Sequence, residues 1–220
     1  MKTYEFDSKI KKVGRFGANV SDDQIKNETM FFNCDLHFAW KNGGDITRSF
    51  IKSLPRDWVN DDVVIDTRVH MLMPNWYPCI AGFHHDDIHR PNNGQPDYDN
   101  MKYKSEHILG IVNAGICPTH FALGKSKFNK VDPASGLNIY QVWHDDVVKK
   151  LEEGELELVQ AEDRTLYEFD WQTWHTGTGA VGTGWRWFGR VSRKTDRVDN
   201  ITNEIRRQVQ VYQDNLTEGW

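Results

Sequence analysis

Apolar and polar residues alternate with a period of two along much of this chain, a pattern typical of β-strands that bury one face. Residues 156–159, 165–169 and 185–192 show this alternation. The longest predicted strand, residues 62–73, is instead identified by its many β-branched side chains and by Pro74, which follows it. Residues 107–113 are typical of a short buried strand, and residues 119–123 follow as another. The pattern therefore predicts a chain built mostly from strands.

Helical patterns are short and few. Asp45 can cap a helix over residues 46–54. Asp145 and Asp146 can open a second helix, which Gly154 ends. Many short strands, with helices gathered early in the chain, predict a mainly β protein: a sandwich or barrel with a few buttressing helices.

Composition narrows the class of protein. The 220 residues contain no internal repeat and no Pro/Ser-rich linker, so a single domain over residues 1–220 is expected. Aromatic residues make up 12% of the chain, with nine Trp, which excludes a disordered chain. The chain shows neither an apolar run long enough for a membrane helix nor an apolar secretory segment. Its three widely spaced Cys suit a reducing compartment, so a cytoplasmic protein without a membrane partner is expected.

The densest group of chemically active side chains lies in residues 82–90, which contain three His and two Asp. A solvated polar loop is the simplest interpretation, but Phe83 and Ile88 indicate partial burial of the segment. His85 and His89 have the i, i+4 spacing of a zinc-binding helix, although flanking prolines leave little room for a helix here. A third pattern in the same segment is more specific.

His84 and Asp86 form an H-x-D pattern, in which both side chains project to one face of a strand and can reach the same ion. An imidazole and a carboxylate are two members of the two-His-one-carboxylate set that binds non-haem Fe(II) and leaves coordination positions open. His85 and Asp87 satisfy the pattern on the other face, so the choice of pair stays open, with His84 and Asp86 preferred. A further H-x-D, at His144, lies in a predicted helix and is assigned a structural role.

A third ligand is expected at His175, which stands between a predicted strand and a glycine-rich loop. In the strand that follows, Arg186, Phe188 and Arg190 share one face. Guanidiniums that point inward beside aromatic rings are costly unless they meet anions, and Arg can bind a carboxylate through two parallel hydrogen bonds. This strand therefore predicts an anion site near His175.

The order and spacing of these motifs resemble the Fe(II)- and 2-oxoglutarate-dependent dioxygenase superfamily over about residues 71–193. Members of that family carry an H-x-D pair, a distal His and, shortly after it, an Arg, all on a double-stranded β-helix, or jelly roll. Here these residues are His84 and Asp86, then His175, then Arg186. The resemblance implies a jelly-roll oxygenase domain in which the first three of these residues bind Fe(II).

The same resemblance implies roles for further side chains. Arg186 is expected to hold the distal carboxylate of 2-oxoglutarate with help from Thr119, and Arg190 is expected to contact the substrate; which of the two Arg holds 2-oxoglutarate stays open. The implied reaction uses O2, converts 2-oxoglutarate to succinate and hydroxylates a C–H bond. The carboxylate ligand favours hydroxylation over halogenation, because halogenating relatives have a small, non-ligating residue in its place.

Charge indicates the class of substrate. The formal net charge of −5 disfavours nucleic acid as the main partner. Residues 185–197 nevertheless carry five basic side chains against one acid, and Arg90 lies beside the expected ligands. A small anionic substrate, such as an amino acid or a nucleotide, is therefore expected to bind at Arg190 and Arg90. Two alternatives stay open: a cupin-like metalloenzyme that does not use 2-oxoglutarate, and a non-catalytic jelly-roll binding module.

Overall fold

Antiparallel sheets make up most of the fold in the computed structural model, which describes residues 2–17, 20–91, 94–132 and 136–213. The larger sheet has five strands in the order β2 (Ile10–Arg15), β8 (Thr165–Asp170), β5 (Glu106–Val112), β10 (Gly184–Arg193) and β4 (Val63–Leu72). The smaller sheet consists of β1 (Thr3–Ser8), β6 (Thr119–Asn129), β7 (Glu157–Gln160) and β9 (Trp174–Gly177). A short pair contacts β4 and consists of β3 (Met30–Phe32) and β11 (Glu204–Arg206).

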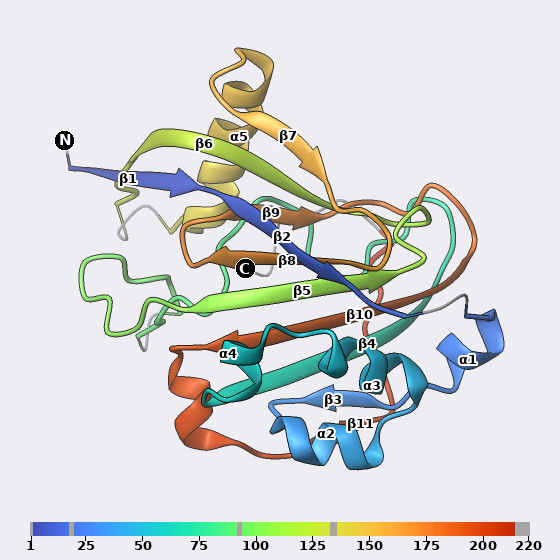
Figure 1. Cartoon of the computed structure of the whole chain (residues 1–220). Coiled ribbons are helices and arrows are strands. Elements are labelled where there is room, and N and C mark those ends of the chain that lie inside the picture. Colours follow the sequence, from blue (N-terminus) through green and yellow to red (C-terminus); the bar gives the residue numbers. More distant parts are fainter. Residues whose placement is uncertain (1, 18–19, 92–93, 133–135, 214–220) are drawn as a thin grey trace.

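The helices fall into two groups on opposite sides of the molecule (Figure 1). The early group consists of α1 (Asp22–Lys26), α2 (Leu36–Asn42), α3 (Asp45–Lys52) and α4 (Arg56–Val59). On the other side, α5 (Ile139–Glu152) lies beside β6. A short 3-10 helix, η2 (Asp196–Asn200), follows β10. The prediction of a mainly β chain with few helices, most of them early, is confirmed.

Three of the four apolar clusters in the described chain hold the sheets and helices together. On the outer face of the five-stranded sheet, the early helices bury Phe50 and Trp58 against strand residues such as Trp187. On the smaller sheet, α5 packs Trp143 against Trp174 of β9. Between the two sheets, a third cluster combines side chains of β5, β6 and β8. Because strand residues alternate, β5 and β10 each present one face to the helices and the other to the space between the sheets.

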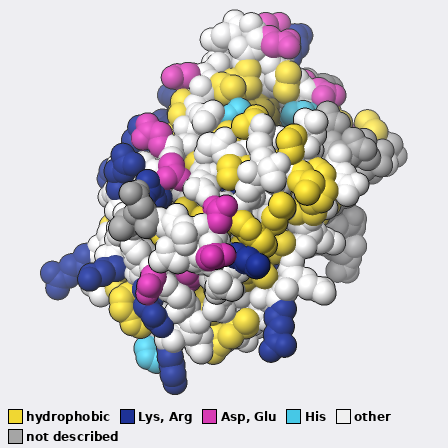
Figure 2. Space-filling view, turned by 90° about the vertical axis from the view of Figure 1, so that its right-hand side faces the viewer, with side chains coloured by type: hydrophobic (Ala, Val, Ile, Leu, Met, Phe, Trp, Pro, Cys, Tyr) yellow, Lys and Arg dark blue, Asp and Glu magenta, His cyan; other side chains and the backbone are white. Residues whose placement is uncertain are grey.

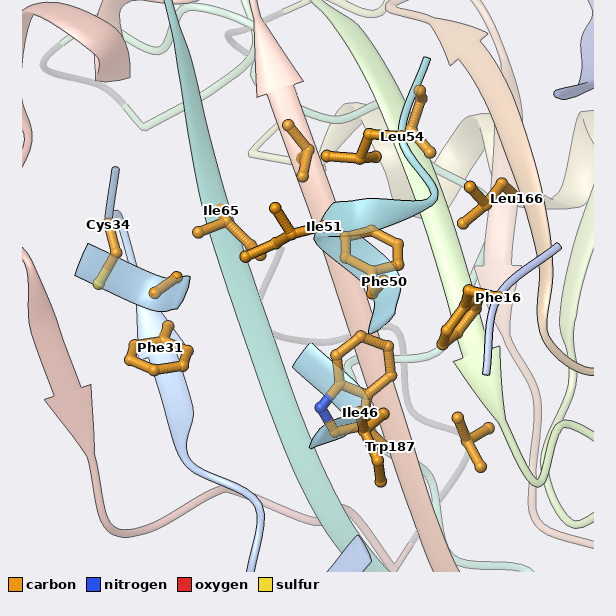
Figure 3. Packing of buried hydrophobic residues seen from close by; sticks show 14 of the residues in the cluster. Phe16, Phe31, Cys34, Ile46, Phe50, Ile51, Leu54, Ile65, Leu166 and Trp187 are labelled. Atoms are coloured by element: carbon orange, nitrogen blue, oxygen red, sulfur yellow. The ribbon is translucent and has the colours of Figure 1, made fainter. Parts of the chain in front are cut away.

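Two glycines, Gly110 of β5 and Gly189 of β10, lie opposite each other across the strand pair, under the aromatic rings of the outer cluster. A methyl group at Gly110 would lie 2.7 Å from the Phe16 ring and 2.9 Å from the Phe50 ring. Figure 3 shows these two rings within the outer cluster, beside Trp187. Gly110→Ala is therefore expected to lower the free energy of unfolding by about 1–3 kcal/mol, as overpacking of a core does. Urea denaturation measures this change. Gly115→Ala, which meets no atom within 4 Å, is the control, and equal losses in both variants would contradict this packing.

Helix α5 begins earlier than its acidic residues suggest. The side chain of Asn138 caps its first turn by accepting the backbone N–H of Tyr140, and the side chain of Gln141 completes a capping box with Asn138. Asp145 and Asp146 therefore lie in the middle of the helix, and the prediction that they open it is wrong. The sequence signal for the true start is an Asn followed three residues later by a Gln.

Within the described part of the chain, no helix is both long and apolar enough to cross a membrane. On the face drawn in Figure 2, acidic and basic side chains are interspersed, and hydrophobic side chains form a band between them. The coloured part of this face thus presents no broad basic surface of the kind that binds nucleic acid mainly through phosphate contacts. The charged side chains inside the molecule say more about its function than those on this face.

Candidate metal centre and its cavities

Two histidines that are far apart in the sequence are joined by a β-bridge. The backbone N–H of His84 donates to the carbonyl of His175 at 3.1 Å, and the N–H of His175 donates to the carbonyl of His84 at 3.3 Å. His175 belongs to β9, whereas His84 lies in the loop that follows β4. The strand expected around His84 is reduced to this single bridge, which holds the loop against β9.

The side chains of His84, Asp86 and His175, hereafter the triad, converge so that their ligand atoms lie within 4.8 Å of one another. Each imidazole donates its Nδ1–H to a backbone carbonyl at 2.9 Å, His84 to Gly82 and His175 to Thr173. The two Nε2 atoms lie 3.9 and 3.0 Å from the Asp86 carboxylate. Nδ1 atoms anchored in this way leave the Nε2 lone pairs available to a metal ion, as is usual for metal-binding histidines.

The protonation states of His84 and Asp86 suit a divalent metal. Burial, reinforced by His175, lowers the pKa of His84 to about 3, so its imidazole is neutral at pH 7. Burial alone would raise the pKa of Asp86, but Arg190 and His175 hold that pKa well below its usual range. A neutral imidazole and a carboxylate anion are the forms that bind metal, and two imidazoles with one carboxylate suit a first-row ion such as Fe(II).

His85 and Asp87, the alternative H-x-D pair, point away from the triad. The Nδ1 atom of His85 lies 2.8 Å from the Tyr98 hydroxyl, and its ring packs on Trp174 with centroids 3.7 Å apart. The Asp87 carboxylate lies 3.8 Å from a nitrogen of Arg190. Side chains of neighbouring residues thus diverge, and the pair in the triad is the one that the fold brings to His175.

Three other features of the sequence lie apart from the triad. Residues 82–90 contain no helix, and His89 is exposed, so the zinc-helix hypothesis has no structural basis. His144 lies in α5, where its Nδ1 accepts the backbone N–H of Phe83 at 3.1 Å, which agrees with the structural role expected for it. Arg90 is exposed and lines neither of the two cavities described below.

A cavity of about 250 Å³, hereafter the inner cavity, opens beside the triad. Its wall includes Thr119 of β6 and the inward side chains of β10, which are Arg186, Phe188 and Arg190. The alternation predicted for this strand therefore holds: one face carries the two arginines into the molecule, and Trp187 on the other face packs under the helices. Every predicted site residue except Arg90 lines this cavity.

Arg186 is a buried cation without an acidic partner among the residues that the structure describes. Only 2% of the residue's surface is exposed, and its Nε donates to the carbonyl of Cys117 at 2.7 Å. One Nη lies 3.4 Å from the Thr119 hydroxyl, and the guanidinium lies over the Phe188 ring. Burial lowers its pKa, and no Asp or Glu of the described residues forms an ion pair with it. A buried charge without a counter-ion is costly, so this wall is suited to receive an anion.

Arg190 is surrounded by the protein's own carboxylates. It forms ion pairs with Asp86, with Asp66 at 3.3 Å and with Asp87 at 3.8 Å. Arg197 is a second cation of the network, 2.7 Å from Asp66. Arg190, which was expected to contact the substrate, is therefore engaged by these acids and is placed to orient the Asp86 ligand.

The carboxylate of Asp66 is the structural centre of this network. It accepts a hydrogen bond from the backbone N–H of Asn33 at 2.9 Å, and it forms ion pairs with Arg190 and Arg197. Removing one member of a buried ion pair typically costs about 3–5 kcal/mol, so Asp66→Asn is expected to destabilise the fold by that amount in urea denaturation at pH 7. Glu5→Gln, which breaks an exposed pair, is the control and should cost less than about 1 kcal/mol.

The destabilisation by Asp66→Asn should also depend on pH. Burial would raise the pKa of Asp66, but Arg190, Arg197 and the Asn33 N–H hold it below its ordinary value of 3.8. A carboxyl whose pKa is lowered by folding stabilises the native state above its unfolded pKa, and this contribution is lost as the pH falls. The difference between wild type and variant should therefore shrink below about pH 4, and a difference that grew on acidification would contradict the network.

The inward face of β4 is polar, which the strand prediction alone did not reveal. Asp66, Arg68 and His70 occupy every second position of this strand and line the inner cavity. Each lies opposite an inward residue of β10 in the antiparallel register. Three polar residues in alternation within a β-branched strand are a signal that could have identified this wall from the sequence.

A larger cavity of about 880 Å³, hereafter the outer chamber, adjoins the inner cavity, and Arg68, His70 and His84 line both. Its opposite wall is the chain from β11 to Tyr212. Tyr212 is tied down by two backbone hydrogen bonds with Tyr77, at 2.7 and 2.9 Å. The outer chamber thus leads toward the triad beneath the segment from β11 to Tyr212. Backbone pairing with β3 fixes one end of this segment, and pairing with Tyr77 fixes the other.

Comparison with known proteins assigns no family. No protein family and no curated protein matches the sequence. The structure titled "Crystal Structure of EvdMO1" matches with a TM-score of 0.36 and 11% sequence identity, over 85% of this chain. The chain spans about half of that structure, 47% of its length. A likeness this weak assigns neither fold nor function, so the function must be inferred from the site itself.

Proposed function

We propose that this chain is an Fe(II)- and 2-oxoglutarate-dependent dioxygenase that hydroxylates a C–H bond of a small anionic substrate. The proposal depends on one observation: a single cavity combines the triad with the buried guanidinium of Arg186, which has no acidic partner in the described chain. This combination suits a co-substrate that chelates a metal ion at one end and carries a carboxylate at the other. 2-Oxoglutarate has both groups.

Arg186 would hold the distal carboxylate of 2-oxoglutarate. A guanidinium can donate two parallel hydrogen bonds to a carboxylate, and the Thr119 hydroxyl beside it is a further donor. The Phe188 ring packs on the guanidinium and excludes water from one of its faces. Since Arg stays protonated over the whole physiological range, binding at this end would need no proton transfer.

The triad would hold Fe(II) through the Nε2 atoms of His84 and His175 and a carboxylate oxygen of Asp86. When bound, the ion would supply open coordination positions and the redox chemistry that couples conversion of 2-oxoglutarate to succinate with hydroxylation by O2. Two backbone carbonyls fix the orientation of the imidazoles. Arg190 would keep the Asp86 carboxylate ionised and oriented.

We assign the two sheets to one jelly-roll domain, a double-stranded β-helix over residues 1–220. The apolar cluster shared by β5, β6 and β8 supports this assignment, because it makes the space between the sheets one continuous interior. The site also draws on both sheets: His175 lies on β9 of the smaller sheet and Arg186 on β10 of the larger one. A site built from both sheets needs them to fold as a unit.

Product stoichiometry tests the proposed function. The protein is incubated with Fe(II), 2-oxoglutarate, O2 and pools of anionic metabolites, and succinate is quantified together with each pool member. Succinate is expected to form in equal amount to the loss of one pool member, and His175→Ala is expected to form none. Loss of a pool member and of O2 without loss of 2-oxoglutarate would instead favour the cupin-like metalloenzyme.

A further inference from the structure

On the inward face of β4, one cation forms no ion pair with any described residue of the chain. In the antiparallel pairing with β10, Asp66 lies opposite Arg190 and forms an ion pair with it. Arg68, the next inward residue of β4, lies opposite Phe188, an aromatic residue that offers no charge. The pairing of opposite charges along this wall therefore ends at Arg68.

Arg68 is partly buried, and the hydrogen bonds of its side chain within the described chain go to backbone carbonyls. Its Nη1 donates to the carbonyls of Phe31 and Thr67, at 2.8 Å in both cases. In the chain as described, no carboxylate lies within ion-pair distance of its guanidinium. Burial lowers the pKa of Arg68, and the attraction of Asp66 does not offset that effect. The Nε and Nη2 groups of Arg68 are therefore available to a ligand.

Positive charge is concentrated around Arg68. The Phe32 ring has three guanidiniums near it, with distances to its centroid of 5.5 Å for Arg68, 5.6 Å for Arg197 and 3.7 Å for Arg206. Arg197 and Arg206 each have a carboxylate partner within 3 Å. Arg68 is the member of this group that lacks one among the described residues, so an anion at Arg68 would complete the charge balance.

Arg68 also stands where a substrate would pass. It lines both the inner cavity and the outer chamber, as does His70, which follows it on the same face. The buried Nδ1 of His70 has no hydrogen-bond partner in the described chain. Toward the outside, Arg206, Arg207 and Gln210 line the outer chamber. A molecule that enters this chamber would meet several polar groups before it reaches the triad.

We propose that Arg68, assisted by Arg206, binds an oxyanion group of the substrate, either a carboxylate or a phosphate, at the junction of the inner cavity and the outer chamber. This inference rests on the proposed function, since it takes the outer chamber as the substrate's route to the triad. The residue that binds the substrate anion is then Arg68 and not Arg190, because Arg190 already forms ion pairs with carboxylates. 2-Oxoglutarate would meanwhile occupy Arg186, so that the two anions bind to different guanidiniums.

Calorimetric titration of the full-length, metal-free protein with sodium sulfate and with sodium acetate tests this site. Sulfate has the charge and shape of a phosphate group, and acetate presents a carboxylate. The anion that binds with the lower Kd therefore identifies the class of oxyanion that the site prefers. Arg68→Gln is expected to weaken that binding by at least about 10-fold, and Arg206→Gln by about 3-fold. Arg48→Gln, which removes an exposed ion-pair residue of α3, should leave the binding unchanged.

The proposal is overturned if the wild-type protein binds neither anion saturably, or if binding survives Arg68→Gln and is lost in Arg186→Gln. Arg68→Lys keeps the charge but loses the planar guanidinium, so an intermediate affinity separates loss of the anion contact from a failure to fold. The proposed function has its own readout, the absorption of the anaerobic Fe(II)–2-oxoglutarate complex. If that absorption is missing while anion binding still depends on Arg68, the dioxygenase proposal fails and the anion site stands.

Discussion

Replacing His84 by alanine is expected to remove Fe(II) binding and all turnover, whereas replacing its neighbour His85 leaves the metal site intact. His84 directs its Nε2 into the triad, while the ring of His85 packs on Trp174. Changing even an outer partner of a metal ligand typically weakens metal binding by roughly 10–100-fold, so loss of one of three protein ligands should cost more than about 100-fold.

Anaerobic equilibrium dialysis with Fe(II) measures this difference, with circular dichroism as a check that both variants fold. His85→Ala is expected to lower the melting temperature, because it removes a buried ring from an aromatic cluster, yet to keep the wild-type affinity for Fe(II). The opposite pattern, with Fe(II) lost in His85→Ala and kept in His84→Ala, would transfer the ligand role to His85 and Asp87.

Replacing Arg186 by glutamine is expected to raise the Kd for 2-oxoglutarate by about 30-fold to about 4,000-fold. Truncating one partner of a buried, hydrogen-bonded charge pair costs about 2–5 kcal/mol, and each 1.4 kcal/mol is about tenfold in affinity. The affinity for Fe(II) should stay at the wild-type value, because Arg186 contacts Cys117, Thr119 and Phe188 and, in the described chain, forms no hydrogen bond or ion pair with the triad.

Thr119→Val provides the graded comparison for Arg186→Gln. It removes one hydroxyl from the same wall, and a hydrogen bond to a charged group contributes about 1.5–3 kcal/mol, so the Kd should rise by about 10–100-fold and by less than in Arg186→Gln. Both constants are obtained by titrating 2-oxoglutarate into the Fe(II)-loaded protein under anaerobic conditions. An unchanged Kd in Arg186→Gln would remove the basis for a 2-oxoglutarate site and favour the cupin-like alternative.

Features that depend on neighbouring residues were predictable from the sequence. The β-branched residues of 62–73 and the alternation in 185–192 identified β4 and β10, because both signals are local to the strand and hold whatever the tertiary structure. The H-x-D motif and the distal His likewise identified the residues that the fold brings together as the triad. The sequence left two overlapping H-x-D pairs open. The structure decides between them, because it shows in which direction each side chain points.

Features that depend on strand pairing were not predictable. The ion pair between Asp66 and Arg190 exists because β4 and β10 pair in one particular register, and no local pattern specifies that register. The substrate role that the family resemblance implies for Arg190 therefore took no account of its carboxylate partners. Strands β1 and β2 were also not predicted, and β2 has no fully buried residue, which leaves only a weak apolar alternation to detect.

The central claim is that the triad and Arg186 together bind one metal ion and 2-oxoglutarate. Anaerobic titration of the wild-type protein with Fe(II) and 2-oxoglutarate, followed by visible absorption, tests it most directly, because a charge-transfer band requires the keto acid to be bound to the ferrous ion. We predict a weak visible band that appears only when both are present and saturates with 2-oxoglutarate. A wild-type protein that binds Fe(II) but develops no such band at saturating 2-oxoglutarate would contradict the claim.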